Sequence, residues 1–194
     1  KKITIIKPRW ILTVNEQFDL LTDSALIIEN DIIQSILPVS ELHTVEGLDE
    51  AEVVSLDNHV LMPGLINTHT HAAMSLLRGI ADDLPLMDWL NNHIWPAESK
   101  WIDRQFIQDG VKLCVAEMIR SGTTCLNDMY FFPDIMAKTC QQMGMRATTG
   151  LIVLDFPTVW AQSADEYLSK AMAVIDEVKE YPLISTAFAP HAPY

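Results

Sequence analysis

The chain has 194 residues, of which 49% are hydrophobic and 20% are charged, and its formal net charge is −13. This composition is that of a folded globular protein and excludes a disordered chain. The excess of negative charge would repel a polyphosphate partner, which argues against binding of nucleic acid.

The cysteines and the N-terminal stretch bear on the cellular compartment. Cys114, Cys125 and Cys140 contain no CxxC pair, so we expect reduced thiols and no disulfide framework. In the stretch KKITIIKPRWILTV the apolar run is interrupted by Lys7, Pro8 and Arg9, which makes it a poor signal peptide. No apolar run approaches the ~20 residues of a membrane span. These features favour a soluble cytoplasmic protein and leave open whether it forms a homo-oligomer.

Residues 1–60 contain short apolar runs rich in β-branched residues, namely ITII, ALIIE, IIQSIL and EVVSL. Asn30 and Asp31 lie between two of these runs and predict a tight turn. Helical periodicity of useful length is missing from this stretch. We therefore expect a small β domain over residues 1–60.

After Pro63 and Gly64 the pattern changes to apolar strands separated by helices. The expected strands are GLINTH, TTCLNDM, RATTGLIVLDF and LISTAFA. Alternation of this kind indicates parallel βα units, in either a barrel or a doubly wound sheet. A glycine-rich phosphate loop follows none of these strands, which argues against a nucleotide-binding Rossmann fold.

The expected helices are placed by their caps and by their apolar spacing. Asp103 is a candidate N-cap for a helix that runs to about Arg120, and a second helix runs from about Asp134 to Gly144. Ser163 and Glu166 form an S-x-x-E capping box. The apolar stripe of this third helix is expected at Leu168, Ala171, Met172, Ile175 and Val178.

The stretch LMPGLINTHTH ends in two histidines, His69 and His71. Residues two apart on a strand face the same side, so the two imidazoles are presented together. In a barrel the chemistry lies at the carboxyl ends of the strands, and this pair closes the first strand. Neutral imidazoles suit zinc or iron. The alternative is a pair of histidines that hydrogen-bond to the backbone.

The stretch PGLINTHTHAAMSLLRG resembles the first-strand signature of the amidohydrolase superfamily, in the branch of aminohydrolases and triazine chlorohydrolases. ADDLPLMDWLNNHIWPAESK and FAPHAPY resemble segments of methylthioadenosine/S-adenosylhomocysteine deaminases. The resemblance implies a (β/α)8 TIM-type barrel with a small N-terminal β-sandwich. On this view residues 61–194 supply the first four strands of a truncated barrel, and residues 1–60 supply part of the sandwich.

The resemblance also implies roles for individual residues. His69 and His71 correspond to metal ligands, Glu98 to the glutamate that binds the ribose hydroxyls, and His191 to a substrate-contacting histidine. An ionised carboxylate can accept both hydrogen bonds of a vicinal diol. The alternative for Glu98 is an exposed charge at a helix start. For His191 it is a side chain fixed by backbone contacts.

The implied reaction is hydrolytic deamination of an adenine nucleoside, with a metal-activated water attacking the ring carbon that bears the amino group. The proton carrier and the remaining metal ligands are expected beyond Tyr194, so the 194-residue chain is expected to be inactive alone. LISTAFAPHAPY lacks the lysine that bridges two metals in binuclear relatives, which favours one divalent ion, zinc in the first place and iron in the second. Arg146 begins a strand and does not match the arginines that some relatives direct toward substrate.

Three pairs of side chains are weaker candidates. Asp82 and Asp83 lie in an expected lid loop and could reach substrate, but such carboxylates are usually just solvated. Asn127 and Asp128 end the second strand, where capping or turn formation is the alternative, and Trp89 and Trp95 could stack on a purine or anchor a loop. Three other functions stay open. They are a related hydrolase acting on guanine, cytosine or a chlorotriazine, a non-catalytic assembly-forming relative, and a structural zinc site.

Overall fold

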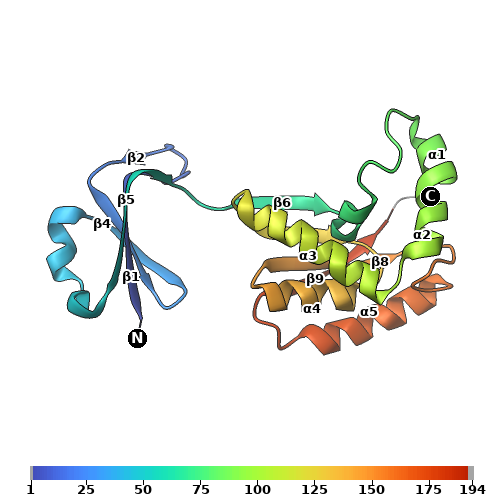
Figure 1. Ribbon diagram of the computed structural model, residues 1–194. Coiled ribbons are helices and arrows are strands. Elements are labelled where there is room, and N and C mark those ends of the chain that lie inside the picture. Colours follow the sequence, from blue (N-terminus) through green and yellow to red (C-terminus); the bar gives the residue numbers. More distant parts are fainter. Residues whose placement is uncertain (1, 192–194) are drawn as a thin grey trace. The chain divides into compact units, whose positions relative to one another are not determined.

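The computed structural model describes residues 2–191 and separates the chain into two units, Lys1–Pro63 and Gly64–Tyr194 (Figure 1). Each unit has its own sheet and its own hydrophobic core. No helix within residues 2–191 combines the length and the apolar character needed to cross a bilayer. The three cysteines, all in the described part of the chain, are free thiols.

The first unit is a five-stranded sheet, and its core contains Ile5, Ala25 and Ile27. The four predicted apolar runs are confirmed as strands, and the turn predicted at Asn30 and Asp31 joins two of them. Two short 3-10 helices, which the sequence did not predict, precede the last long strand. The strands are β1 (Ile3–Leu12), β2 (Leu20–Leu21), β3 (Ser24–Glu29), β4 (Ile32–Pro38) and β5 (Glu52–Leu61), and the 3-10 helices are Val39–Thr44 and Leu48–Glu50.

The second unit is built on a four-stranded parallel sheet in which neighbours in sequence are neighbours in space. Its strands are β6 (Leu65–Thr70), β7 (Thr123–Met129), β8 (Arg146–Val153) and β9 (Ile184–Pro190). The predicted alternation of parallel strands and helices is therefore confirmed. Parallel strands end at one edge of the sheet, and this edge collects the side chains considered below.

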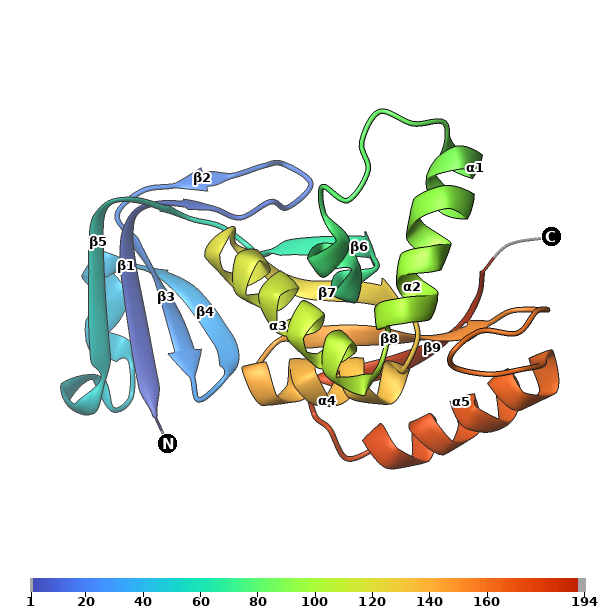
Figure 2. The same cartoon turned by 45° about the vertical axis from the view of Figure 1, so that its right-hand side comes forward.

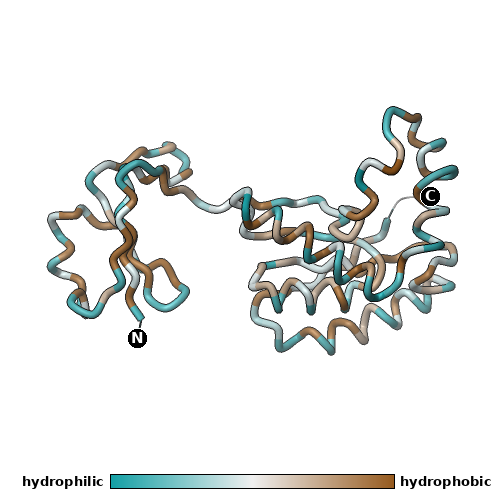
Figure 3. Tube along the Cα trace, in the orientation of Figure 1, coloured by the Kyte–Doolittle hydropathy of each residue, from teal (hydrophilic) through white to brown (hydrophobic). Residues whose placement is uncertain are grey.

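Helices α3 (Arg104–Arg120), α4 (Pro133–Met143) and α5 (Ala164–Val178) lie along one face of this sheet (Figures 1 and 2). Each of these helices carries both hydrophobic and hydrophilic residues along its length (Figure 3), as expected for an amphipathic helix that packs one face against a hydrophobic core. Asp103 caps α3 as predicted, because its carboxylate accepts a hydrogen bond of 2.8 Å from the Phe106 amide. Gly144, in a left-handed conformation with φ 73°, ends α4 where expected.

Helix α5 departs from the prediction in two details. Ser163 accepts from the Glu166 amide as expected, but the Glu166 carboxylate accepts from the amide of Gln162 and not from that of Ser163. The predicted stripe is also shifted, since Leu168 and Met172 are 44% and 55% exposed. The buried positions are Tyr167, Ala171, Val174 and Val178, because the Tyr167 ring enters the core while its hydroxyl bonds to Thr158.

The segment expected as a loop after the first strand is largely helical. It contains a 3-10 turn (Ala72–Leu77), then α1 (Leu86–Trp89), a π-helical turn (Leu90–Ile94) and α2 (Trp95–Trp101). Helices α1 and α2 form one continuous helical run beside the edge where the strands end (Figure 2). Pro96 has no amide hydrogen to donate within the helix, which explains the irregular turn before it. Leu77, Ile94 and Ala97 form the small core that holds this run.

Candidate metal and substrate site

His69 and His71 lie together at the carboxyl end of β6. Their ring centroids are 5.2 Å apart and the ring planes cross at 78°. The predicted same-side placement of the pair is therefore observed. The two rings are therefore neighbours in an edge-to-face arrangement.

The protonation of the His71 ring follows from its hydrogen bond. Its Nδ1 lies 2.7 Å from the Met129 carbonyl oxygen at the end of β7. A carbonyl oxygen only accepts, so Nδ1 carries a hydrogen, and in the neutral ring Nε2 is the nitrogen whose lone pair can bind a metal. A backbone carbonyl that fixes one ring nitrogen is the usual way in which a metal-binding histidine is oriented.

The end of β7 also fixes the backbone on both sides of His71. The Asp128 carboxylate, 3% exposed, accepts hydrogen bonds from the Thr70 hydroxyl at 2.8 Å and from the Ala72 amide at 2.6 Å. Asn127 donates from its side-chain amide to the Thr68 carbonyl at 3.1 Å. Asn127 and Asp128 thus hold the stretch that carries the histidines, a structural role that differs from the expected alternative of capping or turn formation.

Helix α3 supports the same stretch from the other direction. A Cβ atom at Gly110 would lie 2.5 Å from the Ala73 carbonyl oxygen, a distance that real Cβ atoms do not show. Glycine is therefore required where α3 passes directly against the turn that follows His71.

Glu98 on α2 points its carboxylate toward the end of β7. Its Oε1 accepts a 2.5 Å hydrogen bond from the hydroxyl of Tyr130, a residue that is 7% exposed. Burial raises the pKa of Glu98, while the Tyr130 hydrogen bond and the nearby His71 act in the opposite direction. The expected alternative for Glu98, an exposed charge at a helix start, is wrong, because the carboxylate is half-buried and hydrogen-bonded within the site.

His191 follows the end of β9 and lies at the same edge. Its amide donates to the Val153 carbonyl oxygen at 3.1 Å. Partial burial lowers the pKa of the His191 imidazole, and the charge of nearby His71 lowers it further. The structure thus brings the side chains of all four predicted site residues to one edge. The last three residues of the FAPHAPY motif lie outside the described part of the chain.

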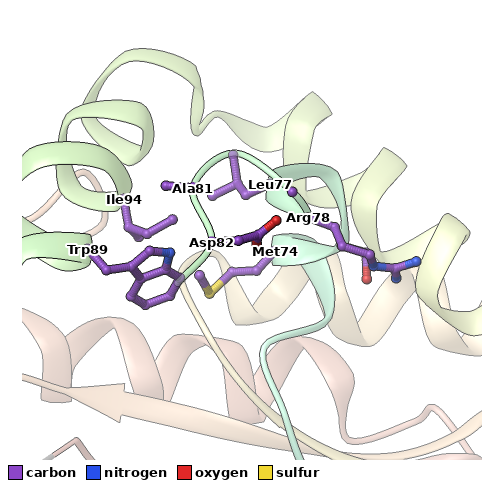
Figure 4. A pocket seen from close by; sticks show the side chains of 9 residues that line it. Met74, Leu77, Arg78, Ala81, Asp82, Trp89 and Ile94 are labelled. Carbon is purple, nitrogen blue, oxygen red and sulfur yellow. The ribbon is translucent and has the colours of Figure 1, made fainter. Parts of the chain in front are cut away.

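Of the weaker candidates, Asp82 and Trp89 lie together in a cavity of about 360 Å³ between the 3-10 turn and α1 (Figure 4). Arg78 also lines it, with its guanidinium committed to the Glu117 carboxylate at 3.0 and 2.8 Å. Asp83 and Trp95 are not among the residues that line this cavity, and Trp95 is 43% exposed.

The donor set fits a metal of the zinc class in part. Two neutral imidazoles from one rigid strand are suitable nitrogen ligands for zinc or iron. Within residues 2–191, however, no cluster of three or more histidine, cysteine or acidic side chains has the geometry of a metal site. The alternative of a structural zinc site with four ligands from these residues is therefore wrong.

Sequence reasoning missed two residues of the site, Tyr130 and Thr70. Tyr130 directly follows β7, beside the flagged Asn127 and Asp128, so its position at a strand end was the available signal. Thr70 lies between the two histidines and faces the opposite side of β6, where it binds Asp128.

Comparisons with known proteins agree with this arrangement. A 5-methylthioadenosine/S-adenosylhomocysteine deaminase from Saccharophagus degradans is 48% identical over 190 residues, which are 98% of this chain and 42% of the relative. A 5'-deoxyadenosine deaminase from Methanococcus vannielii is 42% identical over 173 residues, or 87% of this chain and 39% of the relative. The crystal structure of an adenosine deaminase from Xanthomonas campestris with bound zinc superposes with a TM-score of 0.93 at 45% identity, covering 98% of this chain and 43% of that one.

The chain thus spans about 42% of the length of the first of these relatives. Residues 60–194 match the Amidohydrolase family, in agreement with the resemblance of the first-strand stretch. The chain belongs to the amidohydrolase family.

Proposed function

We propose that this chain forms part of a metal-dependent hydrolase that deaminates an adenine nucleoside, such as 5'-methylthioadenosine, S-adenosylhomocysteine or adenosine, to the inosine-type product and ammonia. The observation that carries the proposal is the Glu98 carboxylate, held by Tyr130 beside the His69 and His71 pair. The names of the relatives support the same substrate class.

In this proposal His69 and His71 bind one divalent metal ion, zinc in the first place. The zinc in the related adenosine deaminase structure supports that choice. When bound, such an ion supplies a water whose pKa is lowered toward ~7, so that it can attack at neutral pH. The chain's own contribution is orientation: the Met129 carbonyl sets the His71 ring, and Asp128 holds the backbone around it.

Glu98 and His191 bind the substrate in this proposal. A carboxylate accepts hydrogen bonds from both hydroxyls of a ribose, and burial strengthens such bonds because water competes less. His191 lies at the end of β9, near enough to His71 for their charges to interact, so a substrate bound at the metal comes within reach of both histidines.

The finer fold assignment belongs to the same proposal. The four parallel strands would be part of a (β/α)8 barrel, whose active site lies at the carboxyl ends of its strands. The five-stranded sheet of the first unit would be one layer of a β-sandwich. Strands β6 and β9 lie at the two edges of the described sheet, where further strands would pair.

The alternatives differ in what Glu98 would do. Guanine, cytosine and chlorotriazines have no ribose diol, so on such a substrate the Glu98 carboxylate would lack the pair of vicinal hydroxyls that it is proposed to bind. A non-catalytic relative would have no need of the oriented His69 and His71 pair. A metal-dependent nucleoside deaminase accounts for both features.

Replacing Glu98 by alanine tests the substrate class. Loss of a charged hydrogen-bond partner costs about 1.5–3 kcal/mol, so kcat/KM for adenosine should fall roughly ten- to a hundred-fold. The 2',3'-dideoxy analogue should be nearly unaffected, because it has no hydroxyls for the carboxylate to bind. Steady-state kinetics of the full-length protein on both substrates measure the difference. Asp88→Ala, an exposed carboxylate on α1, is the control. Equal losses on both substrates would show that Glu98 does not bind the ribose.

Replacing His191 by alanine separates a substrate contact from a metal ligand. The variant is expected to keep its metal and to lose about ten- to a hundred-fold in kcat/KM, as for a lost polar contact to substrate. Elemental analysis and kinetics of the same preparation measure both quantities. His59→Ala, on β5 of the first unit, serves as the matched control. Loss of metal in the His191 variant would make this residue a ligand and overturn the assignment.

A further inference from the structure

We infer that Tyr130 is a positioning residue that fixes the Glu98 carboxylate and so determines selectivity for ribose-bearing substrates. The inference rests on the function proposed above for Glu98. Tyr130 lies outside the sequence motifs described above, and it is neither a proposed metal ligand nor a proposed substrate contact.

The contact itself joins two segments that are far apart in the chain. The Tyr130 hydroxyl, just after β7, reaches the Glu98 Oε1 on α2 at 2.5 Å. Tyr130 is 7% exposed, so water has little access to compete for this bond. A hydrogen bond in a dry environment restricts the carboxylate more than a solvated one would.

The direction of the bond is fixed by the protonation of the phenol. A tyrosine phenol carries its hydrogen at neutral pH, whereas an ionised carboxylate has no hydrogen to donate. The phenol therefore donates and the carboxylate accepts. One lone pair of Oε1 is committed to Tyr130, and Oε2 is left to accept from a ligand.

The Tyr130 ring is itself held in place on both sides. Its centroid lies 6.1 Å from that of His71 and 4.9 Å from that of Phe131. One aromatic side chain thus lies beside the His71 ring and binds the Glu98 carboxylate with its hydroxyl. Tyr130 therefore lies between the proposed metal ligand His71 and the proposed ribose-binding group Glu98.

A purely structural role for the bond would be to anchor α2 to the sheet. Ile94 and Ala97 already attach this helical run through the apolar core shared with Leu77. The hydroxyl of Tyr130 is therefore not needed to keep α2 in place, and its loss should affect the aim of the carboxylate more than the fold.

The test is Tyr130→Phe in the full-length, metal-loaded protein, which removes the hydroxyl and keeps the ring. The kcat/KM for adenosine is expected to fall about ten-fold, mainly through KM, because the lost bond involves a charged acceptor. The value for 2',3'-dideoxyadenosine should change less than about two-fold, and metal content should not change. Tyr167→Phe is the matched control, since it removes a buried phenol hydroxyl that bonds to Thr158 on the side of α5.

Combining the variant with Glu98→Ala completes the experiment. Once Glu98 is absent, Tyr130→Phe should have no further effect on ribose selectivity. Suppose that Glu98→Ala lowers kcat/KM for adenosine but not for 2',3'-dideoxyadenosine, whereas Tyr130→Phe lowers kcat/KM equally for both. The inference about Tyr130 is then wrong, while the proposed function stands. If Glu98→Ala lowers kcat/KM equally for adenosine and for its dideoxy analogue, the proposed contact between Glu98 and the ribose is itself wrong. Loss of metal in Tyr130→Phe would show that the ring acts through His71, which also overturns the inference.

Discussion

The double variant His69→Ala/His71→Ala is expected to lose both bound metal and all measurable deamination in the full-length protein. Loss of a partner that only orients a ligand typically weakens metal binding about 10–100-fold, and removing two ligands should cost considerably more. The described residues provide no third ligand nearby to compensate, because they contain no cluster of three metal-binding side chains. Elemental analysis after dialysis, together with a zinc titration, measures the loss.

The matched control is His43→Ala/His59→Ala, which removes two histidines from the first unit. Both double variants should keep the circular dichroism of the parent protein, since His69 is exposed and His71 has a single backbone hydrogen bond to lose. Of the single variants, His71→Ala should be the more destabilising for this reason. Unchanged metal content in His69→Ala/His71→Ala would rule out these residues as ligands.

Much of the fold could be predicted because short local sequence patterns determine where the individual strands and helices begin and end. The strand TTCLNDM matches β7 residue for residue, and α3 begins at the predicted cap Asp103. Alternating strand and helix patterns are sufficient to indicate parallel pairing. The prediction was wrong where tertiary contacts outweigh hydropathy. Tyr167 is buried because Thr158 satisfies its hydroxyl, and this shifts the buried stripe of α5 by one residue from Leu168.

Only those parts of the candidate site that depend on a single local motif could be predicted from the sequence. The spacing of His69 and His71 on one strand was enough to bring their rings together, since strand periodicity is local. Contacts between distant segments were not accessible in this way. Nothing near Tyr130 in the sequence indicates Glu98, which lies 32 positions away and reaches it through the fold of the helical run. Asp128 was flagged by its position at a strand end, but its partners on β6 were not.

The second large effect is expected at Asp128, the buried carboxylate behind the histidine pair. In Asp128→Ala the buried Ala72 amide loses its acceptor, whereas the Thr70 hydroxyl can still donate to the Asn127 carbonyl oxygen at 2.9 Å. An unsatisfied buried donor costs about 1–3 kcal/mol, so the melting temperature should fall by several degrees. Because Thr70 and Ala72 flank His71, the ring should also lose its fixed orientation. We therefore expect metal affinity to fall about 10–100-fold, as for other groups that orient ligands.

Asp134→Ala is the control that separates these two consequences. Among the described residues of this unit, Asp134 is a second buried carboxylate, at 5% exposure; it lies in the first turn of α4 and binds Arg104 of α3 instead of the β6 terminus. It should lose stability with little change in zinc affinity. Asp128→Asn keeps an oxygen that can accept from Thr70 and Ala72, so its zinc affinity should lie between those of the parent and Asp128→Ala. Thermal unfolding of the metal-free proteins and zinc titrations give the two quantities independently. If Asp128→Ala loses stability to the same degree as Asp134→Ala and binds zinc like the parent, then Asp128 supports the fold without orienting the histidines.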